Sequence, residues 1–236
     1  MTGIKNLKNY GKPMNESMDE MSSKIKRKIR FASLKTMLRH LGIIRFMRIV
    51  FDASREQRRL EKHDYEIVRK KGIADNGFVN SQIQSAALFS AMAKVVGKEK
   101  ALELQMEIAE KIACDVMSNM FPSVEELDAT EDAFLASNRY LKAMFEANKR
   151  AGIHDYEIVE DSWDAFQANV TYCAFQAIPE EVGLGEACLA SCRCDEIFLP
   201  EYCAQIGACF KRKSTLARGA DMCDFRFERV KKGGGF

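Results

Sequence analysis

The spacing of apolar residues changes near Gly152, and this change limits the fold more than any other feature of the chain. Before Gly152, apolar side chains recur every three to five residues, as in an amphipathic helix. After it, apolar and polar residues alternate, which indicates strands over residues 156–160 and 165–171. The helices expected from the first pattern cover roughly residues 23–71, 81–96, 101–121 and 131–150. Gly42 bends or breaks the first of them.

The last third of the chain returns to helix and then ends in alternating segments. Residues 173–182 and 186–193 read as inserted helices. Residues 208–216 and 222–230 predict a hairpin whose turn needs Gly219 for a positive φ. The fold class is therefore α+β: a helical N-terminal half, then an antiparallel sheet with inserted helices and a cysteine-rich C-terminal hairpin.

Basic residues are concentrated at the start of the chain. Residues 1–60 contain 15 of the 36 Lys and Arg but only 5 of the 34 Asp and Glu, a formal charge of +10; the remainder has 21 against 29, or −8. Residues 1–22 are polar and predict a mobile tail. We divide the chain into a basic helical extension, residues 1–80, and an α+β domain, residues 81–236.

Cations alternate with Ile, Leu, Phe and Met over residues 23–51, and two interpretations follow. The helix docks on the acidic body of the chain, or it makes peripheral contact with an anionic membrane surface. We do not expect a nucleic-acid partner, because the rest of the chain is acidic and carries no recognition motif.

The sequence has the character of a cytoplasmic protein. It has no apolar run near the roughly 20 residues that span a bilayer, and its first residues lack the apolar core of a secretory signal. We expect no cofactor, because phosphate-loop, dinucleotide-binding and nucleophile-elbow motifs are missing.

Seven of the eight cysteines crowd the last third of the chain. They are Cys173, Cys188, Cys192, Cys194, Cys203, Cys209 and Cys223. In a chain without an export signal, such a cluster is more typical of thiolate chemistry, metal binding or packing than of disulfides. Cys188 and Cys192 are one helical turn apart, so both thiols can share a face.

Three readings of the cluster compete. Packing is the default for any single cysteine, because a free thiol behaves as a small hydrophobe. Zinc is less favoured, because the spacing of Cys188, Cys192 and Cys194 is not that of a zinc ribbon and the closest histidine is His154; we predict no metal ligands. Thiols, carboxylates and guanidinium groups close together in the chain suit hydrolysis, in which a thiolate or carboxylate activates the attack.

Four segments in fixed order carry a resemblance to a known family. They are Asn169-Val170-Thr171-Tyr172-Cys173, Glu181-Val182-Gly183-Leu184-Gly185-Glu186, Cys192-Arg193-Cys194-Asp195 and the hairpin from Phe210 to Phe225. Together they are similar to the L-2-amino-thiazoline-4-carboxylic acid hydrolase family, over roughly residues 85–230. Residues 1–80 lie outside the resemblance.

The resemblance implies a hydrolase that opens a thiazoline ring or a related small cyclic amidine, giving N-carbamoyl-L-cysteine from the named substrate. It implies catalytic roles for Cys173, Cys192, Asp195, Cys223 and Asp224, and substrate binding by Asn169, Thr171, Arg212 and Thr215.

The mechanism keeps two alternatives. Either Cys192 or Cys173 attacks the amidine carbon, or Asp195 activates a water molecule that does. Arg212 would hold the substrate carboxylate, and Asp224 would orient the amidine.

A fainter resemblance supports a second function. The C-terminal half is also similar to 4-vinyl-reductase-type domains, which end in a comparable hairpin. This implies a module that binds a small molecule or zinc without turnover.

Overall fold

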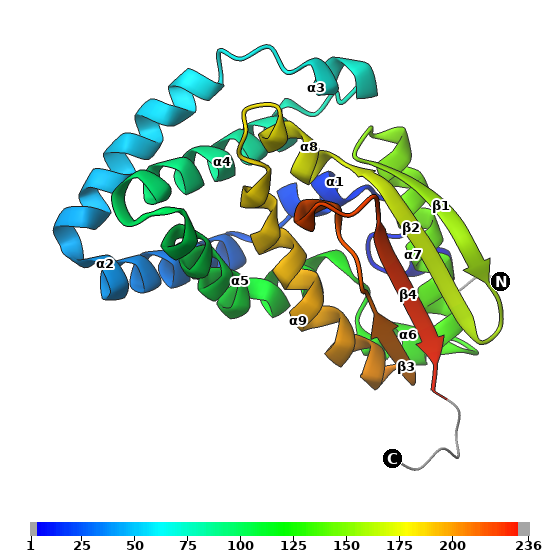
Figure 1. Cartoon of the computed structure of the whole chain (residues 1–236). Coiled ribbons are helices and arrows are strands. Elements are labelled where there is room, and N and C mark those ends of the chain that lie inside the picture. Colours follow the sequence, from blue (N-terminus) through cyan, green and yellow to red (C-terminus); the bar gives the residue numbers. More distant parts are fainter. Residues whose placement is uncertain (1–3, 231–236) are drawn as a thin grey trace.

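The computed structural model describes residues 4–230 (Figure 1). The N-terminal half is helical, and a four-stranded sheet follows with helices inserted between its strands. The helices are α1 (Met14–Asp19), α2 (Ser23–Leu60), α3 (Glu66–Lys71), α4 (Asn76–Val96), α5 (Lys98–Met120), α6 (Val124–Asp128), α7 (Ala133–Arg150), α8 (Ala174–Glu180) and α9 (Leu189–Gln205). The strands are β1 (His154–Asp161), β2 (Ala165–Cys173), β3 (Ala208–Lys211) and β4 (Cys223–Arg229), and the 3-10 turns are η1 (Ile4–Asn6), η2 (Gly185–Cys188) and η3 (Leu216–Arg218). The α+β prediction is confirmed.

The sheet is antiparallel in the order β1-β2-β4-β3, and one of its faces is buried. Phe166 and Val170 of β2 and Phe227 of β4 enter the main core, where they meet side chains of α5, α7 and α9. The opposite face of β2 carries polar side chains, because side chains alternate along a strand. This geometry places the core, and the cavity described below, between the sheet and the helices.

The pairing of β1 with β2 skips one residue near the end of β2. Tyr156 pairs with Val170 and Asp155 pairs with Tyr172, so Thr171 is an extra residue, a β-bulge. Without the bulge, strict alternation would turn Cys173 away from the face that holds Val170. With it, Cys173 pairs with His154 and lies on the buried face.

The long basic helix α2 packs on α4 and α5, and it bends at Gly42, where φ is 69°. Ile49 and Leu60 are fully buried in this packing, and Lys28 pairs with Asp115 of α5 at 2.6 Å. The predicted docking on the chain's own body is therefore confirmed for one face of α2. Whether residues 1–80 form a separate unit stays a prediction; α4, which begins at Asn76, crosses that boundary.

The prediction of a mobile tail is wrong for residues 4–22. Leu7 is buried in the main core, and Asn9 donates hydrogen bonds to the carbonyl groups of Asn119 and Met120 at the end of α5. The expected start of α4 at Ser81 is also wrong, because Asp75 caps the helix earlier by accepting a hydrogen bond from the Phe78 amide. Ile4, Leu7, Tyr10, Met14 and Met18 pack on the main core, so these few apolar side chains outweigh the polar composition of the segment.

The predicted hairpin is shorter than expected on its first side. The strand β3 ends at Lys211, and residues 212–222 form a connection that contains η3. Asp224 Oδ1 accepts hydrogen bonds from the backbone amides of Lys213 and Ser214, at 2.9 and 2.6 Å. A side chain thus satisfies donors that a strand ladder would have used. Gly219 has a φ of 83°, which confirms its predicted turn role.

The helices among residues 4–230 include none that is both long and apolar enough to cross a membrane.

Candidate active site

A largely apolar cavity of about 140 Å³ lies between the sheet and helices α1, α5, α7 and α9. Its polar and thiol-bearing lining residues lie mainly on the sheet, on α9 and on the connection after β3; they are His154, Cys173, Cys188, Ser191, Cys192, Cys194, Asp195, Arg212 and Cys223. Met14 and Met18 of α1 line it on the helical side. A concave, largely apolar space with a few convergent polar groups is typical of a small-molecule site.

Cys173 and His154 form the first pair of polar groups at the cavity, at the paired ends of β2 and β1. The Cys173 Sγ lies 3.5 Å from His154 Nε2. The neighbouring Cys188 thiol, the His154 imidazole and the Gln176 backbone amide hold the pKa of Cys173 well below the ordinary value of a thiol, although burial opposes them. Cys173 is therefore the thiol most ready to ionise, and the thiolate is the nucleophilic form.

Asn148 fixes the proton on His154. The Met14 backbone amide donates a hydrogen bond of 2.8 Å to Asn148 Oδ1. Since that donor cannot accept, the Asn148 amide group faces His154, with its Nδ2 atom 3.2 Å from Nδ1. Nδ1 must then accept, which leaves the imidazole proton on Nε2, directed at Cys173. Asn148 is fully buried, so its hydrogen bond with His154 is shielded from water.

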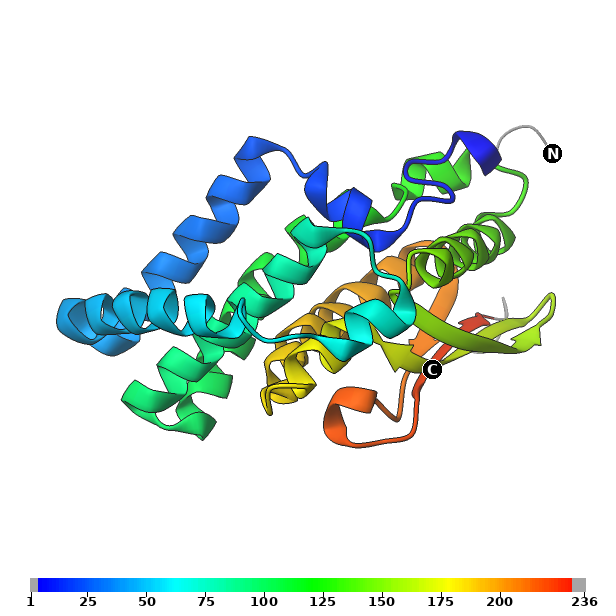
Figure 2. The same cartoon turned by 90° about the horizontal axis from the view of Figure 1, so that it is seen from above.

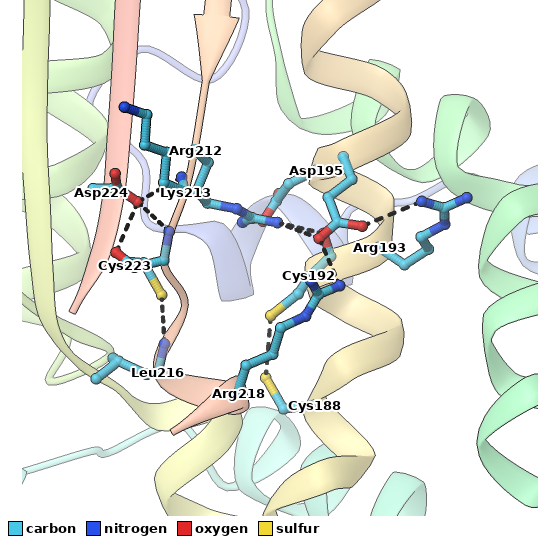
Figure 3. Close-up of polar contacts among 12 residues, drawn as sticks. Cys188, Cys192, Arg193, Asp195, Arg212, Lys213, Leu216, Arg218, Cys223 and Asp224 are labelled. Carbon is cyan, nitrogen blue, oxygen red and sulfur yellow. Dashed lines mark hydrogen bonds and ion pairs between the residues drawn. The ribbon is translucent and has the colours of Figure 1, made fainter. Parts of the chain in front are cut away.

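Cys188 and Cys192 lie on the side of the cavity formed by η2 and α9. Their sulfur atoms are 4.0 Å apart, as their spacing predicted (Figure 3). The contact with Cys173 raises the pKa of Cys188 well above the ordinary thiol value, so Cys188 keeps its proton and can donate it to a Cys173 thiolate. Burial likewise raises the pKa of Cys194 and of Cys223 to about 12.

Asp195 and Arg212 form the second pair of polar groups at the cavity. Figure 3 shows Arg212 reaching from the connection after β3 to Asp195 on α9, where its Nη1 lies 2.8 Å from Oδ2. The Nη2 group donates to the Cys192 carbonyl at 2.8 Å, and Phe225 lies beneath the guanidinium. Burial raises the pKa of Asp195 to about 6, although Arg212 opposes the shift. Asp195 is thus a carboxylate poised to exchange a proton near neutral pH.

Five of the nine predicted site residues line this cavity. They are Cys173, Cys192, Asp195, Arg212 and Cys223. The structure brings them together from β2, α9, the connection after β3 and β4.

The other four predicted residues do not line the cavity. Asn169 faces Asp224 across the outer side of the sheet, and Thr171 is the exposed bulge residue. Asp224 holds the connection after β3 in place through Lys213 and Ser214. Thr215 is buried, and its hydroxyl makes no hydrogen bond to any residue from 4 to 230.

Sequence reasoning missed three contributors: His154, Asn148 and Met14. The signal for His154 was the strand pattern, because pairing the two predicted strands from their shared loop brings the end of one to the start of the other. No local pattern marks Asn148, which is one polar residue on an amphipathic helix. Met14 lay in the segment expected to be a tail.

The sequence predicts no metal ligands, and the arrangement of possible ligand side chains in the structure can be compared with that prediction. Within residues 4–230, no group of three or more His, Cys, Asp or Glu side chains is arranged to hold a metal ion. All eight cysteines are free thiols.

The fold and the cavity define an α+β protein with a thiol-lined cavity of small-molecule size. The sequence model of the L-2-amino-thiazoline-4-carboxylic acid hydrolase family matches residues 78–227, more than half of the chain. The chain belongs to this family. No curated protein matches the sequence.

Proposed function

We propose that this protein hydrolyses L-2-amino-thiazoline-4-carboxylate, or a closely related cyclic amidine, to the ring-opened N-carbamoyl thiol. The observation that carries the proposal is the series of contacts from Asn148 to His154 and from His154 to Cys173 at the wall of the cavity. All three residues lie within the stretch that matches the family. It supplies a thiol whose ionised form is stabilised at a largely apolar, partly buried site.

The size of the cavity supports a substrate of this class. Its volume of about 140 Å³ is close to the ~150 Å³ of an engineered apolar cavity that holds one benzene ring. A five-membered ring with a short carboxylate fits that scale, with its sulfur against the Met and Phe side chains of the wall.

Charge recognition falls to Arg212 in this proposal. Three of the five guanidinium N–H donors are used by Asp195, Glu196 and the Cys192 carbonyl, so two are left for a substrate carboxylate. Its side chain is 3% exposed, so the interaction would take place at low dielectric, where it is stronger.

The first chemical step is attack by the Cys173 thiolate on the amidine carbon. A carbon–sulfur bond forms to the enzyme, and the ring carbon–sulfur bond breaks. The substrate sulfur leaves as a thiolate, which the Nε2–H group of His154 stabilises by a hydrogen bond. The product of this step is an isothiourea on Cys173 that retains every atom of the substrate.

The second step is hydrolysis of that intermediate. Asp195 accepts a proton from water, whose oxygen bonds to the same carbon, and the bond to Cys173 breaks. The enzyme thiolate is restored and a urea, the N-carbamoyl group, is released. The proton taken up by Asp195 passes to the substrate thiolate, so the product leaves with a neutral thiol and Asp195 is again ionised.

The test is incubation with the thiazoline acid, followed by mass spectrometry for the ring-opened product and by titration of the thiol that appears with it. We expect Cys173→Ala to lose at least about 10³-fold in kcat/KM, as for a lost nucleophile. The matched control is Cys209→Ala, an exposed thiol outside the cavity, which should keep full activity.

A second readout separates covalent attack from direct attack by water. Slow hydrolysis in Asp195→Asn should accumulate enzyme heavier by one intact substrate molecule, with the added mass on Cys173. Full turnover by Cys173→Ala rejects the nucleophile. Saturable binding of the substrate to the wild-type protein without any product supports the non-catalytic binding module instead.

A further inference from the structure

The outer side of α2 carries the largest set of exposed apolar side chains in the described chain. Seven of the eleven large hydrophobic residues exposed on residues 4–230 lie on this helix. They are Phe31, Leu34, Ile43, Ile44, Met47, Val50 and Phe51. Such a concentration on one element marks an interaction surface, whereas exposed apolar residues scattered singly need no explanation.

Five of these residues form one continuous stripe after the bend. Two series with a spacing of three or four residues make up the stripe: Ile43, Met47 and Val50, and Ile44, Met47 and Phe51. Residues at this spacing lie on the same side of a helix, so all five share one face. The buried face of the same segment is different: Phe46, Ile49 and Ala53 pack with side chains of α4. The second half of α2 therefore has two apolar faces, of which only one is covered.

The bend at Gly42 places the stripe at an outer corner of the molecule. Figures 1 and 2 both show the elbow of α2 at the end of the molecule away from the sheet. Ile44, two residues after the bend, is 83% exposed. A protruding corner can enter a surface that a flat face would only touch.

The surroundings of the stripe are strongly cationic. The helix carries twelve Lys and Arg, all exposed, against two acids, Asp52 and Glu56, neither of which is exposed. Nine of the twelve make no ion pair with another residue in the range 4–230: Lys24, Lys26, Arg27, Arg30, Lys35, Arg39, Arg45, Arg55 and Arg58. Arg55 lies over the Phe51 ring, 5.9 Å from its centroid, so charge borders the stripe directly.

We propose that the elbow of α2 docks on an anionic lipid bilayer, with Ile43, Ile44, Met47, Val50 and Phe51 in the interface and the flanking cations on the headgroups. Three partners could cover this surface: a second copy of the chain, nucleic acid or a lipid bilayer. The charge and the apolar side chains of the surface distinguish between them. A second copy presenting the same surface would bring like charges together. Nucleic acid would satisfy the cations but offers no apolar counterpart to five large side chains. A bilayer with anionic headgroups matches both features.

The test is co-sedimentation of the full-length protein with vesicles of phosphatidylcholine alone or with added phosphatidylserine. We expect binding to the anionic vesicles that is at least about tenfold tighter than to neutral ones and that weakens as salt rises. Ile44→Asp should reduce this binding by about tenfold or more, because it puts a charge at the tip of the stripe. Arg55→Glu should reduce it by a smaller factor.

The matched control is Val159→Asp, which changes an exposed valine on β1 away from α2. It should bind anionic vesicles as the wild type does. Both Asp variants should keep their helical circular dichroism and their activity on the thiazoline acid, since neither residue lines the cavity.

Three results would overturn the proposal. The first is equal sedimentation with and without phosphatidylserine. The second is a concentration-dependent dimer that Ile44→Asp dissociates while vesicle binding is absent, which makes the stripe a self-association surface. The third is binding of a DNA oligonucleotide, and not of vesicles, that is lost with Ile44→Asp.

Discussion

At the scale of single residues, the candidate site contains two partly buried pairs whose protonation is set by their neighbours. Cys173 is a thiol that ionises easily because Cys188 and His154 both stabilise its thiolate. Asp195 is a carboxyl that ionises late because it is buried. The two shifts run in opposite directions, which is how a nucleophile and a base can be ready at the same pH.

The raised pKa of Asp195 predicts an acid limb in the activity. In the proposed second step Asp195 acts as the base and must be ionised, so kcat should rise with pH through about 6 and level off above it. In Asp195→Asn this limb should disappear, and kcat should fall by about 10²- to 10⁴-fold. A pH profile of kcat for both proteins checks this. An unchanged limb in the variant would mean that another group is the base.

Asn148 predicts a second effect, on the Cys173 thiol itself. Asn148→Ala releases the His154 proton from Nε2, so the thiolate loses a donor and its pKa should rise. The pH midpoint for iodoacetamide alkylation of Cys173, followed by mass spectrometry, should move up by about one pH unit or more. Asn138→Ala is the matched control, a buried asparagine on the same helix whose side chain has no hydrogen-bond partner within residues 4–230. A similar shift in both variants would point to loosened packing instead.

At the scale of elements, the short helix α1 completes a site that lies mostly in the family-matched part of the chain. Met14 and Met18 line the cavity, and the Met14 amide orients Asn148. The match begins at residue 78, so this contribution comes from outside it. The β-bulge at Thr171 acts at the same scale, because one extra residue turns Cys173 to the buried face.

Met14→Pro tests the hydrogen bond from the Met14 amide to Asn148, because proline has no backbone N–H group. Met14 is the first residue of α1, a position where proline is tolerated, and Pro13 before it already has the extended conformation that proline requires of its predecessor. We expect the alkylation midpoint of Cys173 to rise as in Asn148→Ala. Met14→Ala removes the same side chain but keeps the N–H group, so its midpoint should stay at the wild-type value. Equal midpoints in the two Met14 variants would exclude the backbone donor as the cause.

At the scale of the whole molecule, a buried carboxylate joins the basic helix to the body. Glu56 of α2 accepts hydrogen bonds from Ser90 and Lys94 of α4, and from Arg59. The hydrogen bond from Arg59, followed by the contacts with Lys94, lowers the pKa of Glu56 to about 2. The ionised form is therefore favoured in the folded protein.

Glu56→Gln should therefore destabilise the protein in a pH-dependent way. A folded-state pKa below the unfolded one adds stability above about pH 4.5, and this stability is lost as pH falls toward 2. We expect a loss of about 1–3 kcal/mol in the free energy of unfolding at pH 7 that shrinks toward pH 2. Urea unfolding at several pH values checks it, with the exposed Glu61→Gln as control. A loss independent of pH would assign the effect to packing.

Several parts of the structure could be predicted because they depend on residues that are close together in the sequence. The change of period at Gly152 gave the α+β order, and Gly219 gave the turn. The shared face of Cys188 and Cys192 followed from helical spacing alone. Less regular segments were misread: the polar residues 4–22 pack through a few side chains such as Leu7, and Asp224 shortens β3 by holding the chain that follows it.

The sequence by itself determined the fold class, the family and the concentration of thiols, because periodicity, motif order and composition are properties of neighbouring residues. Only the tertiary structure decided which thiol contacts the His154 imidazole, and that Asn148 and the Met14 amide orient that imidazole. It also decided that Asn169 and Asp224 lie on the outer side of the sheet. The physical reason is strand register. One extra residue at Thr171 changes which face Cys173 joins, and that depends on packing between segments far apart in the chain.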